Sequence, residues 1–342
     1  MVSVNAGAST VSDDTPFLWD LSLAGEKLGL SLEPHDKPRR ILRERSSAHV
    51  VVTMHGFIDT LDTGSLRRHR NLRCPLLPSQ EFVDDACMLE IQDVSTVIVA
   101  HARENHQLTL LALRDGHNLQ ACPLDRPWNT AKRGGVSALT TLMQPLQFAS
   151  GGYDHKVHLW HIEDDCSGAS PVELAIRHTS VVHSLLPLLD TSHKLVSAGA
   201  DCNVRLWDMS SERVTHSFKT SSIPYNVHRT DSPFCTLLEV AHRDLQFEIH
   251  DHRMVPKLPT QRFGFYTEDI HGRYMKGDTW SHYFVSGNRH GELRLWDLRN
   301  VTSQPAHSRC FDDQVIQVMR TGDHILACSR RNEFVLLNLH SV

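Results

Sequence analysis

The sequence lacks the marks of a metal-binding, secreted or membrane-spanning protein. Its eight cysteines lie far apart and include no Cys-x-x-Cys pair, so neither a zinc site nor a disulfide framework is indicated. No run approaches the ~18 apolar residues of a membrane span, and the N-terminus MVSVNAGASTVSDD has neither the basic start nor the apolar core of a signal peptide. We therefore expect reduced cysteines, no metal, no cofactor, no membrane partner, and an intracellular location in the cytoplasm, the nucleus or both.

An overall positive charge is also missing. The 342 residues contain 35 Lys and Arg against 40 Asp and Glu, which gives a formal net charge of −5. A protein of this charge has no general attraction to nucleic acid or to anionic membranes, so only a local basic patch would bind them.

Three stretches of the chain are versions of one another. Phe148–Ile162 reads FASGGYDHKVHLWHI, Leu195–Met209 reads LVSAGADCNVRLWDM, and Phe284–Leu298 reads FVSGNRHGELRLWDL. Each has a β-rich run, a turn built on Gly or Asp, and a second alternating run that ends in Trp. This pattern predicts a β-hairpin that recurs along the chain.

The spacing of the repeat predicts seven units. Trp160 and Trp207 are 47 residues apart, and Trp207 and Trp296 are 89 apart, which leaves room for one degenerate copy between them. Extending this period places the repeated position near Leu61, Leu111, Trp160, Trp207, His250, Trp296 and Leu337.

On these residues the chain resembles the WD-repeat family, whose units of about 40–45 residues each form a four-stranded propeller blade. The resemblance implies an all-β fold, with residues 15–342 forming a single seven-bladed β-propeller behind a disordered tail at residues 1–14. It also implies a function without catalysis. We expect a monomeric propeller that acts as a protein-interaction scaffold within a complex.

Closure of the ring is predicted at the N-terminal end. The seventh unit reaches the end of the sequence directly after its third strand, which would leave a sheet edge exposed to aggregation. The segment Pro16–Leu23, PFLWDLSL, has strand composition and no other assigned place. We expect it to be the fourth strand of the seventh blade, and a short helix is the alternative.

A hydrogen-bonded tetrad is typical of WD-repeat blades, and the resemblance transfers it fully to one unit. Its members would be His178, Ser197, Asp201 and Trp207. The unit at Trp160 keeps Ser150 and Asp154 but has no His at the matching place, and the unit at Trp296 has His290 where Asp is expected. His178, Ser197 and Asp201 also suggest a catalytic triad, but the structural tetrad accounts better for all of them, with the Trp207 indole N–H engaged.

Two tetrapeptides predict a partner-binding rim. Trp296-Asp297-Leu298-Arg299 and His250-Asp251-His252-Arg253 fall at the same place in adjacent units. This pair resembles substrate receptors that dock on the large propeller adaptor of a cullin-RING ubiquitin ligase. We expect Arg253 and Arg299, beside Asp251 and Asp297, to project from one rim and bind a partner's carboxylate or carbonyl oxygens. The alternative is a structural Arg paired with its own Asp.

An irregular insert, Met254–Met275, predicts an interaction loop because it carries two prolines and the aromatic residues Phe263, Phe265 and Tyr266. Packing of these rings on the blade edge is the alternative.

A basic segment of the sequence indicates nucleic acid or chromatin as an alternative partner. Between Lys37 and Arg73, nine basic residues stand against Glu44, Asp59 and Asp62. They are Lys37, Arg39, Arg40, Arg43, Arg45, Arg67, Arg68, Arg70 and Arg73. The segment predicts, as the alternative function, a nucleic-acid- or chromatin-associated propeller. A charged outer strand that prevents edge pairing is the other interpretation.

Overall fold

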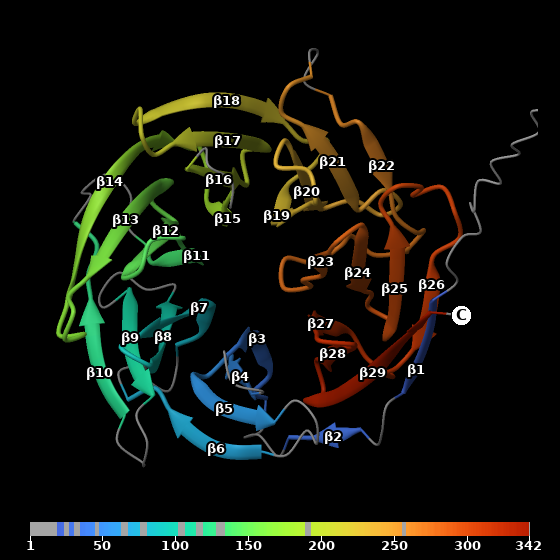
Figure 1. Ribbon diagram of the computed structural model, residues 1–342, viewed down its shortest axis with the longest axis horizontal. Helices are drawn as coiled ribbons and strands as arrows, with labels where there is room; N and C mark the ends of the chain where they lie inside the picture. The colour runs from blue at the N-terminus through green and yellow to red at the C-terminus, as the bar shows by residue number, and fades with distance from the viewer. Residues whose placement is uncertain are drawn as a thin grey trace, which may run out of the picture.

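The computed structural model describes residues 19–23, 27–30, 35–44, 48–62, 68–75, 81–101, 107–113, 119–127, 134–188, 193–254 and 258–341. The tail predicted over residues 1–14 lies outside these ranges. Within them every regular element is a β-strand, and the strands form seven antiparallel sheets arranged in a ring (Figure 1). The predicted seven-bladed all-β propeller is therefore confirmed.

Within each blade the strands follow one another from the centre of the ring outward. Blade I comprises β3 (Pro38–Arg43), β4 (Ala48–Thr53), β5 (Phe57–Asp62) and β6 (Arg68–Arg73). Blade II comprises β7 (Val83–Ile91), β8 (Val94–His101), β9 (Leu108–Leu113) and β10 (Leu119–Leu124). Blade III comprises β11 (Val136–Thr141), β12 (Gln147–Gly152), β13 (Lys156–Ile162) and β14 (Ala169–Arg177). Blade IV comprises β15 (Val182–Pro187), β16 (Lys194–Gly199), β17 (Asn203–Asp208) and β18 (Arg213–Lys219).

The remaining three blades complete the ring. Blade V comprises β19 (Pro224–Arg229), β20 (Cys235–Val240), β21 (Phe247–Asp251) and β22 (Gln261–Phe263). Blade VI comprises β23 (Asp278–Trp280), β24 (Tyr283–Gly287), β25 (Glu292–Asp297) and β26 (Ala306–Arg309). Blade VII comprises β27 (Val315–Thr321), β28 (His324–Ser329), β29 (Glu333–Ser341) and β1 (Trp19–Leu23), with the short β2 (Leu28–Gly29) also paired to β29.

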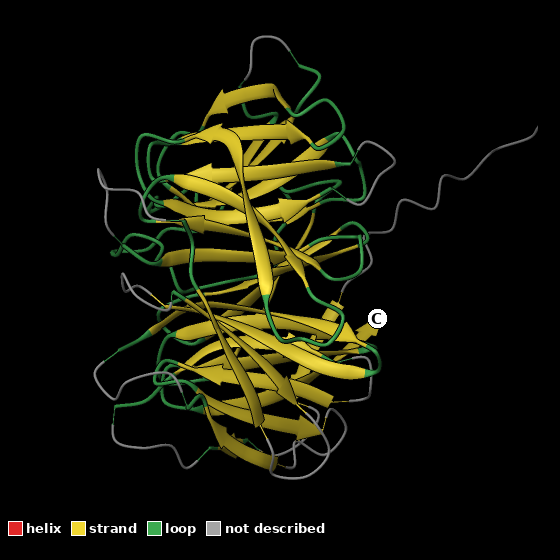
Figure 2. Cartoon of the chain, turned by 90° about the vertical axis from the view of Figure 1, so that its left-hand side faces the viewer, coloured by secondary structure: helices red, strands yellow, loops and turns green. Residues whose placement is uncertain are grey.

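The core lies between neighbouring blades. Because each sheet is covered on both faces, the second and third strands are apolar in near-continuous runs, as in β9, where all six residues are buried. The seven repeated positions all lie on third strands and are at most 3% exposed. Between blades V and VI the packing is aromatic, with Phe247 and Phe284 centred 5.0 and 5.7 Å from Trp296. Figure 2 shows the ring from the side, with loops on both of its faces.

The N-terminal strand closes the ring. β1 pairs antiparallel with β29, in a register that runs from Trp19 opposite Ser341 to Leu23 opposite Leu337. The predicted closure is confirmed for residues 19–23, and the helix alternative is wrong there. The rest of the proposed strand, residues 16–18, lies outside the described part of the chain.

β-Bulges change which residues of the innermost strands point toward the centre of the ring. In six of the seven first strands the pairing register shifts by one residue near the strand start. In blades I, II and III the shift leaves Arg39, Asp84 and Ser137 without a partner in the ladder. A bulge re-aims side chains, and these three residues contact a segment from the opposite side of the ring.

Candidate functional site

The two faces of the ring differ in their turns. The turns between first and second strands, and between third and fourth strands, gather at one face. We call it the Arg face, because it includes the turns that hold Arg253 and Arg299. The turns between second and third strands and the links between blades gather at the opposite face, the Asp face, which includes Asp154 and Asp201.

Arg253 follows β21 and pairs with Asp251. Its backbone N–H and its Nε donate to Asp251 Oδ1 at 2.9 and 3.0 Å, and its Nη2 donates to Oδ2 at 2.7 Å. The side-chain hydrogen bond from Arg253 is the main reason that the pKa of Asp251 falls to about 2. The guanidinium also lies 4.3 Å from the centre of the Phe234 ring, yet the Arg253 side chain remains 61% exposed.

Arg299 repeats this geometry in blade VI. Its Nε donates to Asp297 Oδ1 at 3.0 Å and its Nη2 to Oδ2 at 2.6 Å, while the guanidinium lies 5.9 Å from the centre of the Tyr283 ring. The side chain is 56% exposed. Local Arg–Asp pairing, the structural interpretation, is thus present at both sites, and both arginines also remain accessible from solvent.

Apolar side chains accompany these arginines on the Arg face. Phe234 is 46% exposed and Met254, which follows Arg253 directly, is 49% exposed. We call Arg253, Arg299, Phe234, Met254 and Tyr283 the Arg-face patch. It combines exposed apolar surface with guanidinium groups whose orientation is fixed by their own aspartates.

Three of the four predicted tetrad residues form one network in blade IV. His178 Nδ1 lies 3.0 Å from Asp201 Oδ1, and Nε2 lies 2.9 Å from Ser197 Oγ. Trp207 is buried beside them, but its Nε1 has no hydrogen-bond partner among the described residues, so the expectation of an engaged indole N–H is wrong. The ladder of β17 with β18 shifts register between Leu206 and Trp207, a feature absent at the corresponding Trp160.

In blade III an arginine takes the place of the missing histidine. Arg126 Nη1 lies 2.7 Å from Asp154 Oδ1, and both side chains are under 5% exposed. Arg126 Nη2 also donates to the carbonyl oxygens of Gly134 and Gly135 at 2.7 Å. Trp160 Nε1 donates to Ser150 Oγ at 2.9 Å. The repeat pattern does not identify Arg126, because it lies in the irregular link before the blade.

The insert between β22 and β23 bridges the ring on the Asp face. Tyr274 Oη donates to Asp84 Oδ1 of blade II at 3.1 Å, and Arg273 Nη2 donates to the Ser137 carbonyl of blade III at 3.1 Å. The Arg39 guanidinium of blade I lies 3.7 Å from the centre of the Tyr274 ring. The link between blades V and VI is thereby tied to three blades across the channel.

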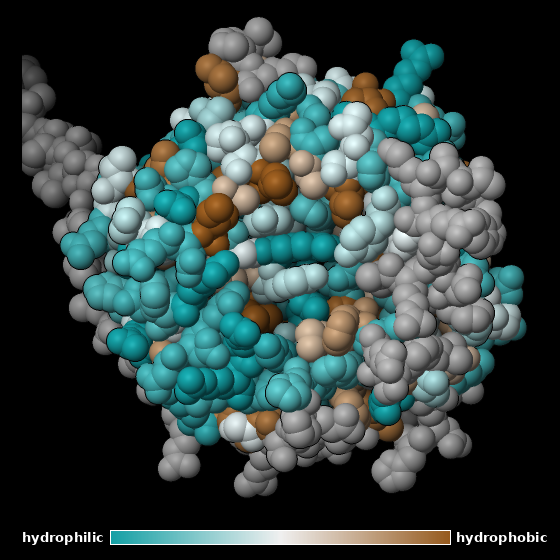
Figure 3. Space-filling model, turned by 180° about the vertical axis from the view of Figure 1, so that it is seen from behind, coloured by the Kyte–Doolittle hydropathy of each residue, from teal (hydrophilic) through white to brown (hydrophobic). Residues whose placement is uncertain are grey.

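The predicted loop Met254–Met275 contains β22, and its predicted aromatic residues divide into two groups. Phe263 and Phe265 are buried at 5% and 8% exposure and pack against Trp296, so for them the blade-edge interpretation holds. Tyr266 is 77% exposed and Ile270 is 47% exposed. Figure 3, which views the ring from behind Figure 1, shows a mostly hydrophilic face with a central hollow and scattered apolar side chains.

Other expected features concern the thiols and membrane spans. None of the eight cysteines forms a disulfide. No group of His, Cys, Asp and Glu suited to a metal ion occurs in the described ranges, and no helix there is long and apolar enough to span a membrane.

A family model matches part of the chain. The model of the WD domain, G-beta repeat, matches residues 172–208, from β14 to the end of β17. This stretch contains the His178–Ser197–Asp201 network, and the ring that surrounds it has seven four-stranded blades. At these residues the chain is similar to a WD repeat, and the fold around them is a seven-bladed propeller.

Solved structures show how widespread this fold is. The crystal structure of Chaetomium thermophilum Raptor is similar over 95% of this chain and 29% of the Raptor chain, with a TM-score of 0.75 and 13% sequence identity. This chain therefore spans less than a third of that protein, and the likeness concerns the fold. Because 1714 solved chains match, the fold alone does not single out a function. No curated protein matches the sequence.

The basic segment of this propeller is not one surface patch. Arg39 and Arg40 are only 8% and 7% exposed because β3 is an innermost strand, and Arg40 Nε lies 2.5 Å from Asp85 Oδ1. The predicted patch is wrong for these two residues. Of the others, Arg43 and Arg73 are exposed, whereas Arg45, Arg67 and the side chains of Arg68 and Arg70 lie outside the described part.

Proposed function

We propose that this propeller is a non-enzymatic scaffold that binds a protein partner through the Arg-face patch. The observation that carries the proposal is the repetition of one exposed arrangement of Arg, Asp and aromatic ring in blades V and VI. Two copies in neighbouring blades can contact one partner surface together. Arg, aromatic and Met side chains are enriched at the centres of protein interfaces and among the residues that dominate their binding energy.

The sharper form of the proposal is a substrate receptor of a cullin-RING ubiquitin ligase, with the propeller adaptor of the ligase as partner. Its support is the pair of Trp-Asp-x-Arg-like tetrapeptides in adjacent blades. Asp251 and Asp297 hold the two guanidinium groups in fixed orientations, which lowers the entropy lost when an exposed edge pairs with a carboxylate or carbonyl group. A nucleic-acid function has less support, because Arg39 and Arg40 face the channel.

Affinity purification with mass spectrometry tests both forms. The variant is Arg253→Ala with Arg299→Ala, and the matched control is Arg213→Ala with Arg309→Ala, which removes two exposed arginines from the fourth strands β18 and β26. Each hot-spot Arg contributes about 2 kcal/mol or more, so losing two should weaken binding on the order of a thousandfold. Folding should change by less than about 0.5 kcal/mol.

The outcomes separate the two forms. Loss of a ligase adaptor from the Arg253/Arg299 variant alone supports the receptor. Loss of other proteins, with no adaptor bound by the wild type, supports the scaffold and rejects the receptor. Identical partner sets for wild type and variant reject the Arg-face patch as the binding surface.

A further inference from the structure

The innermost strands of this propeller, together with residues 271–276, carry a net positive charge, although the chain as a whole is negative. The seven innermost strands and residues 271–276 carry seven Lys and Arg against four Asp and Glu, in a chain of net charge −5. The basic residues are Arg39, Arg40, Arg43, Arg229, Arg273, Lys276 and Arg320. A concave wall of one charge sign raises the local concentration of ions of opposite sign.

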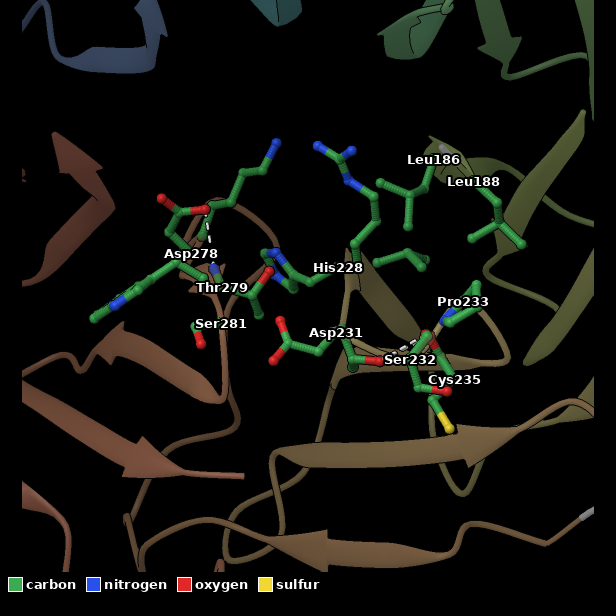
Figure 4. A pocket seen from close by; sticks show the side chains of 15 residues that line it. Leu186, Leu188, His228, Asp231, Ser232, Pro233, Cys235, Asp278, Thr279 and Ser281 are labelled. Carbon is green, nitrogen blue, oxygen red and sulfur yellow. Dashed lines mark hydrogen bonds between the residues drawn. The ribbon is translucent and has the colours of Figure 1, made fainter. Parts of the chain in front are cut away.

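A cavity of about 480 Å³ lies where the innermost strands of blades IV, V and VI reach the Arg face. Leu186 and Leu188 form one wall, and Asp278, Thr279 and Ser281 lie across from them (Figure 4). Arg229 and Lys276 also line it. Its volume falls within the range of about 300–1,000 Å³ that is typical of small-molecule sites.

The two basic residues of this cavity lack direct counter-ions. In the described part of the chain neither Arg229 nor Lys276 forms an ion pair with a carboxylate. The Asp278 carboxylate instead accepts hydrogen bonds from the backbone N–H groups of Arg320 and Thr279, at 2.8 and 2.9 Å. Asp231 pairs with His282 Nδ1 at 2.7 Å. Asp231 and Asp278 also line the cavity, but each carboxylate is hydrogen-bonded or paired to other groups and not to Arg229 or Lys276.

The buried carboxylate of Glu239 is engaged in the same way. It binds His228 Nε2 at 2.6 Å, His271 Nε2 at 2.7 Å and the backbone N–H of Gly277 at 2.8 Å. Burial lowers the pKa of Lys276, which means that the charged amine lacks full hydration where it lies. An anion in the cavity would supply the partner that the protein does not.

The backbone around Lys276 is fixed on both sides. Its N–H donates to the Ile316 carbonyl at 2.9 Å, and its own carbonyl accepts from Val318 N–H at 2.9 Å, which ties it to β27. Asn226 Nδ2 donates to the Met275 carbonyl at 2.8 Å. The backbone that carries the Lys276 side chain is therefore held at the cavity before any ligand binds, which reduces the entropy lost on binding.

We propose that this cavity binds a small organic anion, with Arg229 and Lys276 contacting its phosphate or carboxylate group and Leu186 and Leu188 contacting its apolar part. Arg and Lys are the usual ligands of both groups, and Arg pairs with them through two hydrogen bonds. The site adjoins the Arg-face patch, because the lining residues Pro233 and Cys235 flank Phe234, but it needs no protein partner.

Calorimetric titration of the full chain tests the site with three probes of similar size: phenyl phosphate, benzoate and the neutral benzyl alcohol. We expect saturable binding of at least one anion, and the stronger of the two identifies the preferred group. Hydrogen bonds to charged groups are strong enough that Lys276→Gln and Arg229→Gln should each weaken binding at least tenfold. Lys219→Gln, which removes the same charge from exposed β18, should leave affinity unchanged.

Three results would overturn the proposal. The first is that neither anion binds saturably below about 10 mM. The second is that benzyl alcohol binds as tightly as the anions. The third is that Lys219→Gln and the two cavity variants bind the anion with equal affinity. Arg229 is exposed, so Arg229→Gln keeps the test valid even if Lys276→Gln fails to fold.

Discussion

Asp201 is the carboxylate on which the hydrogen bonds of blade IV converge. It contacts His178 Nδ1 at 3.0 Å and accepts the backbone N–H groups of Thr179 and Asn203 at 2.9 and 3.1 Å. Burial by itself raises the pKa of Asp201, but the hydrogen bonds from His178 and Thr179 outweigh it and hold the pKa well below its ordinary value. The charged form is therefore the one that stabilises the blade.

Replacing Asp201 should cost more than replacing an exposed aspartate. Asp201→Ala removes the carboxylate that His178 contacts, and leaving a buried polar group unpaired costs about 1–3 kcal/mol; the exposed N–H of Thr179 can bind water instead. We expect a melting temperature several degrees below that of Asp164→Ala, which changes an exposed turn residue. Differential scanning calorimetry measures both variants, and equal melting temperatures would show that the network contributes nothing to stability.

At the scale of elements, the link between blades V and VI acts as a strap across the ring. Asp84, only 5% exposed, accepts hydrogen bonds from both Tyr274 and Tyr153. Burial is the main cause that raises the pKa of Tyr153 to about 12; the nearby Arg273 charge opposes this rise, and the Asp84 carboxylate adds to it. The Tyr153 phenol therefore stays protonated and acts as a donor at neutral pH.

Removing one donor hydroxyl from the strap should weaken the whole ring. Tyr274→Phe deletes a hydrogen bond to a buried carboxylate, which typically contributes about 1.5–3 kcal/mol. Tyr266→Phe deletes the same atom from a side chain that is 77% exposed, and should be neutral within about 0.5 kcal/mol. Urea unfolding followed by tryptophan fluorescence compares the two, and equal unfolding free energies would reject a stabilising strap.

The elements differ in how well the sequence predicts them. Hairpin periodicity and the Trp spacing locate all seven third strands, because both are short-range consequences of strand alternation and turn chemistry. The repeat pattern does not predict the role of Arg126, because only the folded link between blades II and III brings it next to Asp154. The Tyr274–Asp84 contact joins residues 190 positions apart, and it depends on ring closure and on the bulge that turns Asp84 inward.

The candidate site is predictable only in part, for the same reason. Arg253 and Asp251 are two residues apart in the sequence, and so are Arg299 and Asp297. Both pairs can therefore be predicted from the tetrapeptides alone. The inward orientation of Arg39 and Arg40 is set by the position of β3 in the ring. A count of charges along the sequence does not contain that information, which is why the basic segment looked like a surface patch.

At the scale of the whole molecule, largely buried histidines in five of the blades couple stability to pH. Burial is the main cause that lowers the pKa of His49, His101, His158, His183 and His252 from 6.5 to about 4. They lie in blades I to V, one in each. Between pH 4 and 6.5 the unfolded chain therefore binds more protons than the folded ring. The stabilisation is complete above pH 6.5 and is lost as the pH falls toward 4.

This propeller should consequently lose stability on mild acidification, before its carboxylates titrate. Even one pKa unit per histidine corresponds to about 1.4 kcal/mol each, or roughly 7 kcal/mol for five, which is comparable with the whole stability of a typical domain. We expect the urea midpoint to fall steadily between pH 7 and 5. His183→Gln should make that slope shallower, whereas His307→Gln, at an exposed position, should leave it unchanged. A midpoint that is constant over this range would mean that the buried histidines protonate without cost. Acid sensitivity would then begin only near pH 4, where the unfolded chain starts to protonate carboxylates such as Asp201 that stay charged in the folded ring.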